Sequence, residues 1–107
     1  MNIVHIPDIT GDGSVKSLAQ IFAAAGVSLP QGNKVKWIYV TDIVKGSTTS
    51  RIGNASVSAT QGMLCSEPVD LRPIPGYDND SLYDLNQIYL FAATGDTISI
   101  AVGIWNF

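Results

Sequence analysis

The stretch that decides the expected fold lies near the end of the chain, where residues 87–105 read QIYLFAATGDTISIAVGIW. Two apolar runs, at 87–93 and 98–105, flank the polar tip Thr94-Gly95-Asp96-Thr97. Glycine reaches positive φ at low cost, so a Gly-Asp pair at the tip suits a two-residue hairpin loop. The sequence therefore predicts a terminal hairpin at about 87–105.

This predicted hairpin is apolar on both of its faces. The loop would pair Ala93 with Ile98 and Phe91 with Ile100. One face would then carry Tyr89, Phe91, Ile98, Ile100 and Val102, and the other Ile88, Leu90, Ala92, Ala101 and Gly103. A hairpin with one solvated side alternates apolar and polar residues instead. We therefore expect both faces of the hairpin to be buried, one against the core of its own domain and the other against a helix or a neighbouring subunit.

A helix is predicted at about residues 14–25, near the start of the chain. Its apolar residues recur at three- and four-residue intervals, which places them on one helical face: Val15, Leu18, Ile21, Phe22 and Ala25. The turn at 10–14 precedes this segment, and Gly26 is placed to end it. This is the single helix that the sequence predicts.

Strand patterns dominate the remainder of the chain. Residues 2–6 and 34–41 read as strands, and a turn at Gly53-Asn54 predicts a hairpin between 48–52 and 55–60. Three prolines within 68–80 favour an edge strand or an extended arm there, because proline cannot donate to a ladder. The expected fold is mostly β: an antiparallel β-sandwich or jelly-roll-like barrel with one N-terminal α-helix, in a single domain spanning 1–107.

The composition favours a protein that buries much of its surface in an assembly. Charged residues make up 14% of the chain and apolar residues 46%, whereas an average soluble domain has roughly 25% charged residues. The net charge is −3, and the six basic residues are scattered instead of forming the stripe that phosphate binding requires. We therefore expect no nucleic-acid partner.

Membrane insertion and disulfide bonding are not expected either. No stretch approaches the ~20 apolar residues of a membrane span, and no signal peptide is visible, so synthesis in a cytoplasm is expected. Cys65 is the single cysteine, and its neighbours Met63 and Leu64 indicate a small buried apolar residue.

No constellation typical of catalysis is visible. The single histidine, His5, lies beside Val4 and Ile6 without a recognisable acid–base partner. Gly11-Asp12-Gly13 lacks the lysine and spacing of an anion-binding loop, so a helix-capping turn is the preferred interpretation. The sequence predicts a protein that is not an enzyme and holds no cofactor.

One acidic cluster raises the question of a divalent cation. Asp78, Asp80 and Asp84 could supply oxygen ligands to Ca²⁺, which takes six to eight of them. Their spacing is not that of an EF-hand, and no glutamate completes the site. A solvated acidic loop is therefore preferred, with the bound ion as the alternative.

Several segments together resemble small structural proteins of tailed bacteriophages. The matching pieces cover roughly residues 35–102 and are 35–40, 51–54, 57–62, Tyr83-Asp84-Leu85-Asn86-Gln87-Ile88-Tyr89 and 93–97. The chain departs from the pattern at 64–67, where such proteins tend to be glycine-rich. The resemblance implies a virion component of the capsid decoration (cement) type, with the major capsid protein and further copies of itself, as a homotrimer, for partners.

Five residues are the predicted contacts of this assembly: Ile88, Leu90, Trp105, Phe107 and Tyr77. The alternative function is a receptor- or glycan-binding module of a phage fibre or tail, with Trp37 or Tyr77 in contact with the ligand.

Overall fold

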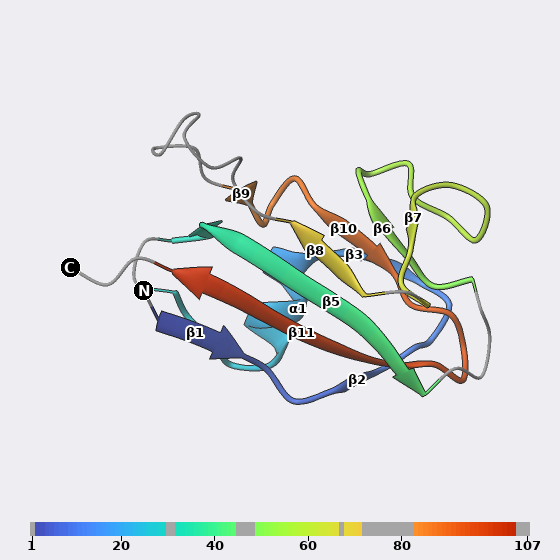
Figure 1. The fold of residues 1–107 in the computed structure, drawn as a ribbon, viewed down its shortest axis with the longest axis horizontal. Coiled ribbons are helices and arrows are strands. Elements are labelled where there is room, and N and C mark those ends of the chain that lie inside the picture. The colour runs from blue at the N-terminus through green and yellow to red at the C-terminus, as the bar shows by residue number, and fades with distance from the viewer. Residues whose placement is uncertain (1, 30–31, 45–48, 67, 72–82, 105–107) are drawn as a thin grey trace.

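Two main antiparallel sheets and one short helix make up the described part of the chain (Figure 1). The computed structural model describes residues 2–29, 32–44, 49–66, 68–71 and 83–104. The prediction of a mostly β, antiparallel, sandwich-like fold with one helix is confirmed. These residues contain no helix long and apolar enough to cross a membrane.

The first sheet is built around one long strand from the end of the chain. β11 (Thr97–Ile104) pairs on one side with β1 (Asn2–His5) and β2 (Ile9–Thr10), and on the other side with β5 (Trp37–Val44). β8 (Val69–Leu71) pairs with the far side of β5 and forms the edge of the sheet. The edge strand expected from the prolines is therefore confirmed for this segment.

The second sheet is smaller, and its strands come from widely separated parts of the sequence. Its order is β3 (Val15–Ser17), β10 (Tyr89–Phe91), β6 (Arg51–Gly53) and β7 (Met63–Leu64). A separate two-stranded ladder joins β4 (Lys34–Val35) to β9 (Tyr83–Asp84). The strand predicted at 34–41 is thus divided between two sheets, with the break at Lys36.

The helix α1 (Leu18–Ala24) begins later than the sequence pattern suggests. Ser17 caps it: the Ser17 hydroxyl accepts from the Gln20 amide, and the Gln20 side chain accepts from the Ser17 amide. Such a reciprocal pair satisfies two amides of the first helical turn. Because Val15–Ser17 pairs with β10, these residues form a strand, and the predicted start at about residue 14 is wrong. Gly26 follows the helix with φ of 76°, as expected for a helix end.

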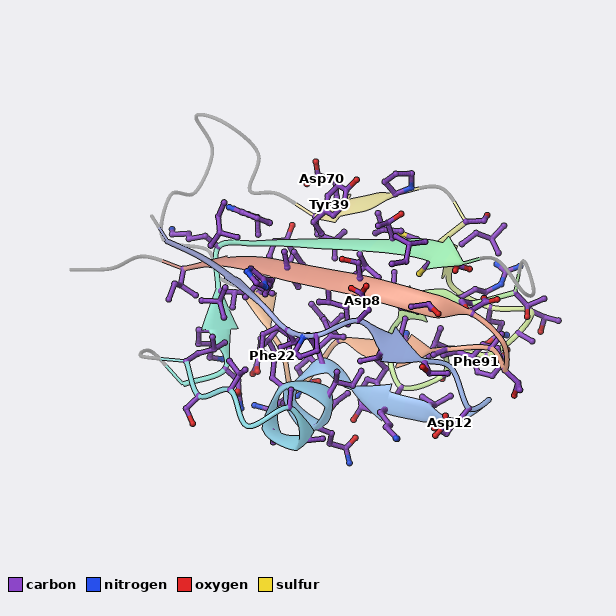
Figure 2. All side chains as sticks on the ribbon, turned by 90° about the horizontal axis from the view of Figure 1, so that it is seen from below. Asp8, Asp12, Phe22, Tyr39, Asp70 and Phe91 are labelled. Atoms are coloured by element: carbon purple, nitrogen blue, oxygen red, sulfur yellow. The ribbon has the colours of Figure 1, made fainter. Side chains whose placement is uncertain are left out.

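The core lies between the first sheet and a layer made of α1 and the second sheet. Alternate residues of β11 face inward, namely Ile98, Ile100, Val102 and Ile104, and all are buried. They pack in one cluster with Phe22 from the helix and Ile52 from β6. Figure 2 shows Phe22 between α1 and the first sheet. Burial of this cluster is the main favourable contribution to folding.

The predicted terminal hairpin is wrong. β10 and β11 lie in different sheets, and the residues between them cross from one layer to the other. β10 is already flanked by β3 and β6, while β11 is flanked by β1, β2 and β5. Neither strand therefore has an edge free to pair with the other. The two apolar faces of this stretch reflect two separate strands that each pack on the core.

The hairpin predicted at Gly53-Asn54 has a different second arm. β6 pairs with β7 through Ile52 and Met63, so the return strand lies at 63–64 and not at 55–60. The intervening residues form a loop in which the Val57 amide donates to the Asn54 carbonyl at 3.0 Å. The side chain of Val57 is buried, so residues 54–62 form an anchored loop and the return strand begins only after it.

Candidate functional site

The first sheet has a face turned away from α1, and we call it the outer face. Its described residues are Ile3 and His5 on β1, Ser99, Ala101 and Gly103 on β11, Trp37, Tyr39 and Thr41 on β5, and Asp70 on β8. Ile3 is 66% exposed and Tyr39 is 37% exposed. Figure 2 shows Tyr39 and Asp70 on the side of the sheet opposite the helix. This face is the largest set of cross-strand neighbours that the described structure leaves uncovered by its own core.

Cross-strand pairing arranges the outer face in rows. One row runs across four strands as His5, Ala101, Tyr39 and Asp70. The next row consists of Ile3, Gly103 and Trp37. In both rows the residue from the central strand β11 is small, whereas its neighbours on β1 and β5 are large. The small residues of β11 therefore lie between larger side chains on both neighbouring strands.

Trp37 lies across Gly103 within this face. A Cβ built on Gly103 would be 2.0 Å from the indole Nε1 of Trp37, so residue 103 must lack a side chain for the indole to lie there. Gly103 is consequently buried although it points outward. The indole of Trp37 and the ring of Tyr39 project from alternate positions of β5, two residues apart on the same face.

A second apolar surface lies on the edge of the other sheet. Met63 and Leu64 form the edge strand β7, and they are 47% and 40% exposed. Met63 also borders a shallow cleft of about 290 Å³ that Val57 and Gly62 line from the neighbouring loop. Exposed apolar residues on an edge strand are typical of surfaces that another chain covers.

A larger cleft, of about 340 Å³, opens between β2, β3 and α1. Its apolar lining comes from Ile21, Ala24, Ala25, Leu90 and Ala92, and charged side chains lie at its rim. Lys16 Nζ is 3.5 Å from Asp12 Oδ2. The Ser14 hydroxyl and amide donate to the Asp12 carboxylate, which with Lys16 lowers the pKa of that group. The rim charges on Asp12 and Lys16 are thus compensated within the chain.

A buried polar cluster holds the crossing between β10 and β11. The Ser50 hydroxyl donates to Asp96 Oδ2 and accepts from the Ala93 amide at 2.9 Å. Asp96 is completely buried, and its backbone carbonyl accepts from the Gly11 amide at 2.8 Å. Three distant segments therefore meet at this crossing. We assign this cluster a structural role, because buried polar groups such as the Ser50 hydroxyl and the Asp96 carboxylate need hydrogen-bond partners.

Cys65 lies against the same cluster. Its amide donates to the Ser50 carbonyl and its carbonyl accepts from the Asp42 amide, both at 3.0 Å. Burial, together with the nearby charges of Asp42 and Asp96, raises the pKa of the Cys65 thiol to about 12. The thiolate is the reactive form of cysteine, so this thiol is inert in the folded chain.

We therefore expect native Cys65 to resist alkylation at pH 9, where a thiol of ordinary pKa 9.0 is half ionised. Mass spectrometry after iodoacetamide treatment measures this directly. The same chain in guanidinium chloride serves as the control and should be alkylated fully. Equal rates in the two samples would contradict the buried, proton-bearing thiol.

The structure places the predicted contact residues differently from the expectation. Ile88 is half-buried and packs against the core cluster. Leu90 is 1% exposed, so its side chain is part of the core and not a contact surface. The assignment of Leu90 to an interface is corrected because that face of β10 packs inward. Trp105, Phe107 and Tyr77 lie outside the described residues.

The acidic cluster is described only in part. Asp84 accepts from Lys34 Nζ at 2.9 Å and from the Asn86 amide at 2.9 Å, and these bonds lower the pKa of its carboxyl group. Asp78 and Asp80 lie outside the described residues. Within the described ranges no group of three or more His, Cys, Asp or Glu side chains could hold a metal ion. The carboxylate of Asp84 is thus engaged by its own chain.

Comparison with known proteins gives no match. Neither family models, nor curated proteins, nor solved structures align with this chain. Sequence reasoning also missed the outer face, although one signal for it was present. The small residues Ser99, Ala101 and Gly103 alternate along β11 with large buried ones, and that alternation distinguishes the outer face from the core.

Proposed function

We propose that this chain is a structural component of a phage virion, namely a capsid decoration (cement) protein that stabilises the shell through contacts bridging its subunits. The observation that carries the proposal is the presence of two exposed apolar surfaces on different sheets. One is the outer face, with Ile3 and Tyr39, and the other is the β7 edge, with Met63 and Leu64. A bridging protein needs at least two contact surfaces, whereas a simple binding module needs one.

The composition supports the same proposal. With 14% charged residues, the chain has few side chains that oppose burial of its surface against other subunits. A decoration protein is present in many copies on a shell, so weak individual contacts become strong collectively. The proposed partners are the major capsid protein and further copies of the chain, and the assembly implied by the resemblance is a homotrimer. The proposed role involves no catalytic step and no nucleic acid.

The β7 edge provides the test of shell binding. Replacing Met63 and Leu64 together with serine should weaken binding to assembled capsids of the encoding phage by about tenfold or more, because two apolar side chains leave the contact. Co-sedimentation of the purified protein with undecorated capsids measures the affinity.

The matched control is Val15→Ser, which changes an apolar residue of similar exposure (41%) at the opposite edge of the same sheet. This variant should bind capsids as the unchanged protein does. A protein that does not bind capsids at all, or a double variant that binds them normally, would refute the proposal.

A second candidate is the receptor- or glycan-binding module of a phage fibre or tail. The observation in its favour is the pair of aromatic side chains on β5, with the indole of Trp37 across Gly103 and Tyr39 two residues away. Aromatic rings of this kind combine a flat apolar surface with a polar group. A glycan-array signal that is lost in Trp37→Ala, with capsid binding absent, would favour this function over the first.

A further inference from the structure

We propose that the cleft between β2, β3 and α1 binds a small organic ammonium ion, with the apolar body of the ligand in the cleft and its charge beside Asp8. Two observations carry this proposal. The floor of the cleft is apolar, and its rim holds a carboxylate that the chain itself does not neutralise. The site is separate from the outer face and the β7 edge, so the proposal does not rest on the virion role.

The cleft exists because the two sheets do not close on this side of the molecule. Among the described strands, β2 pairs only with β11 and β3 only with β10, and residues 11–14 connect the two edges. The Gly11 amide donates to the Asp96 carbonyl at 2.8 Å. The Gly13 amide donates to the Ala92 carbonyl at the same distance. These bonds hold the connection in place, so the cleft is formed before a ligand enters it.

The floor of the cleft has the size and the chemistry of a small-molecule site. Apolar side chains line it from three elements, namely Ile9 from β2, Ile21, Ala24 and Ala25 from α1 and its end, and Leu90 and Ala92 from β10 and the residues after it. Its volume of about 340 Å³ lies within the range of about 300–1,000 Å³ that is typical of such sites. Ligand pockets combine a mostly apolar lining with a few polar groups that orient the ligand.

The rim of the cleft supplies these polar groups, and its net charge is negative. The charged lining residues are Asp8, Asp12 and Lys16. Figure 2 shows Asp8 on the side of the first sheet and Asp12 on the side of β3. Lys16 Nζ is 3.5 Å from Asp12 Oδ2, so these two charges compensate each other. Within the described part of the chain, the exposed Asp8 side chain forms no hydrogen bond or ion pair.

The uncompensated charge determines the class of ligand. An ammonium group beside Asp8 gains an attraction that a neutral group lacks, and an anion would be repelled by Asp8. Lys16 is the one cation among the described lining residues, and it is already held by Asp12. Affinity for ligands with the same apolar body should therefore fall from ammonium to neutral to anionic head groups.

Titration of the ¹⁵N-labelled protein with hexylamine, followed by amide chemical shifts, tests the site. The amide signals of Ile21, Leu90 and Ala92 should shift and saturate, with a dissociation constant on the order of 0.1–1 mM. Hexanol and hexanoate carry the same chain with neutral and anionic head groups. Hexanol should bind at least threefold more weakly than hexylamine, and hexanoate more weakly still. Shifts confined to other surfaces, or equal affinities for the three probes, would overturn the proposal.

Charge variants should change the affinity for hexylamine in opposite directions. Asp8→Asn should weaken it at least threefold and leave hexanol binding unchanged. Lys16→Gln should strengthen it at least twofold, because Asp12 is then released from its ion pair. Asp84→Asn, the same charge change on β9, is the control and should have no effect. A weaker affinity in both the Asp8 and the Lys16 variants would contradict the electrostatic assignment.

A steric variant tests the position of the apolar body. Ala24→Phe places a ring at the cleft and should weaken hexylamine binding at least fivefold. Ala23→Phe makes the same change at the preceding exposed position, which does not line this cleft, and should bind normally. Thermal unfolding followed by circular dichroism confirms that each variant is folded. Equal binding by these two variants would show that the ligand lies elsewhere.

A lysine side chain of another protein carries the same ammonium group on a shorter apolar stem. Nα-acetyl-lysine methylamide is therefore the probe for that source. It should bind at least threefold more weakly than hexylamine, because its polar amide groups do not match the apolar floor. Binding as tight as that of hexylamine would assign the cleft to a lysine of a partner chain and would overturn the free small ligand.

Discussion

Replacing Gly11 with alanine is expected to leave the chain unfolded or to lower its free energy of unfolding by about 3 kcal/mol or more. A Cβ at this position would lie 1.9 Å from the carbonyl oxygen of Ala93, which is a backbone atom and not the end of a flexible side chain. The two backbones are held together from both sides. The Gly11 amide donates to the Asp96 carbonyl, and the Gly13 amide donates to the Ala92 carbonyl, each at 2.8 Å.

The control for this substitution is Gly53→Ala. A Cβ on Gly53 would have its nearest neighbours at 3.6 Å, which is an ordinary van der Waals contact. The expected change is therefore within about 1 kcal/mol. Urea unfolding followed by circular dichroism compares the two variants. If Gly11→Ala were as stable as Gly53→Ala, the close approach between the turn after β2 and the crossing would not exist.

The second large effect is expected at Ser50. Ser50→Ala removes the hydroxyl that joins the Asp96 carboxylate to the Ala93 amide, and both groups are in a buried environment. A buried donor or charged acceptor that loses its partner has a full desolvation cost, so the free energy of unfolding should fall by about 2–4 kcal/mol. The same urea titration measures this decrease.

Ser56→Ala is the matched control, because Ser56 is exposed in the loop after β6. Its substitution should change stability by no more than about 0.5 kcal/mol. A double-mutant cycle with Asp96→Ala, which removes the accepting oxygens, then isolates the interaction between Ser50 and Asp96. Additive effects of the two substitutions would contradict a direct bond between these side chains.

Local sequence signals predicted the parts of the fold that depend on neighbouring residues. The strand at the start of the chain, the end of the helix at Gly26 and the edge position of Val69–Leu71 all follow from short patterns. The start of the helix did not follow. Val15 fits the helical spacing, but pairing of its segment with β10 outweighs that preference. Tertiary pairing is not visible in an 11-residue window.

The terminal hairpin failed for a related reason. A glycine turn between two apolar runs is compatible with one hairpin and also with two strands in different sheets. The choice is made by Gly11 and Ser50, which hold residues 93–96 in the crossing conformation from positions more than forty residues away. The prediction of Leu90 as an interface residue was based on the same hairpin, and for this reason it placed on the surface a side chain that lies in the core. The outer face depends on cross-strand rows that only the complete sheet defines.

The central place of β11 has a consequence for how the chain acquires its structure. This strand is translated after β1, β2 and β5, yet it is the strand with which all three pair. During synthesis the earlier strands have no shared partner, and their apolar sides stay accessible to aggregation or chaperones. Sheets closed by such distant pairings fold slowly, on the millisecond-to-second scale. Any truncation that removes residues 97–104 should therefore yield a chain that accumulates in insoluble form.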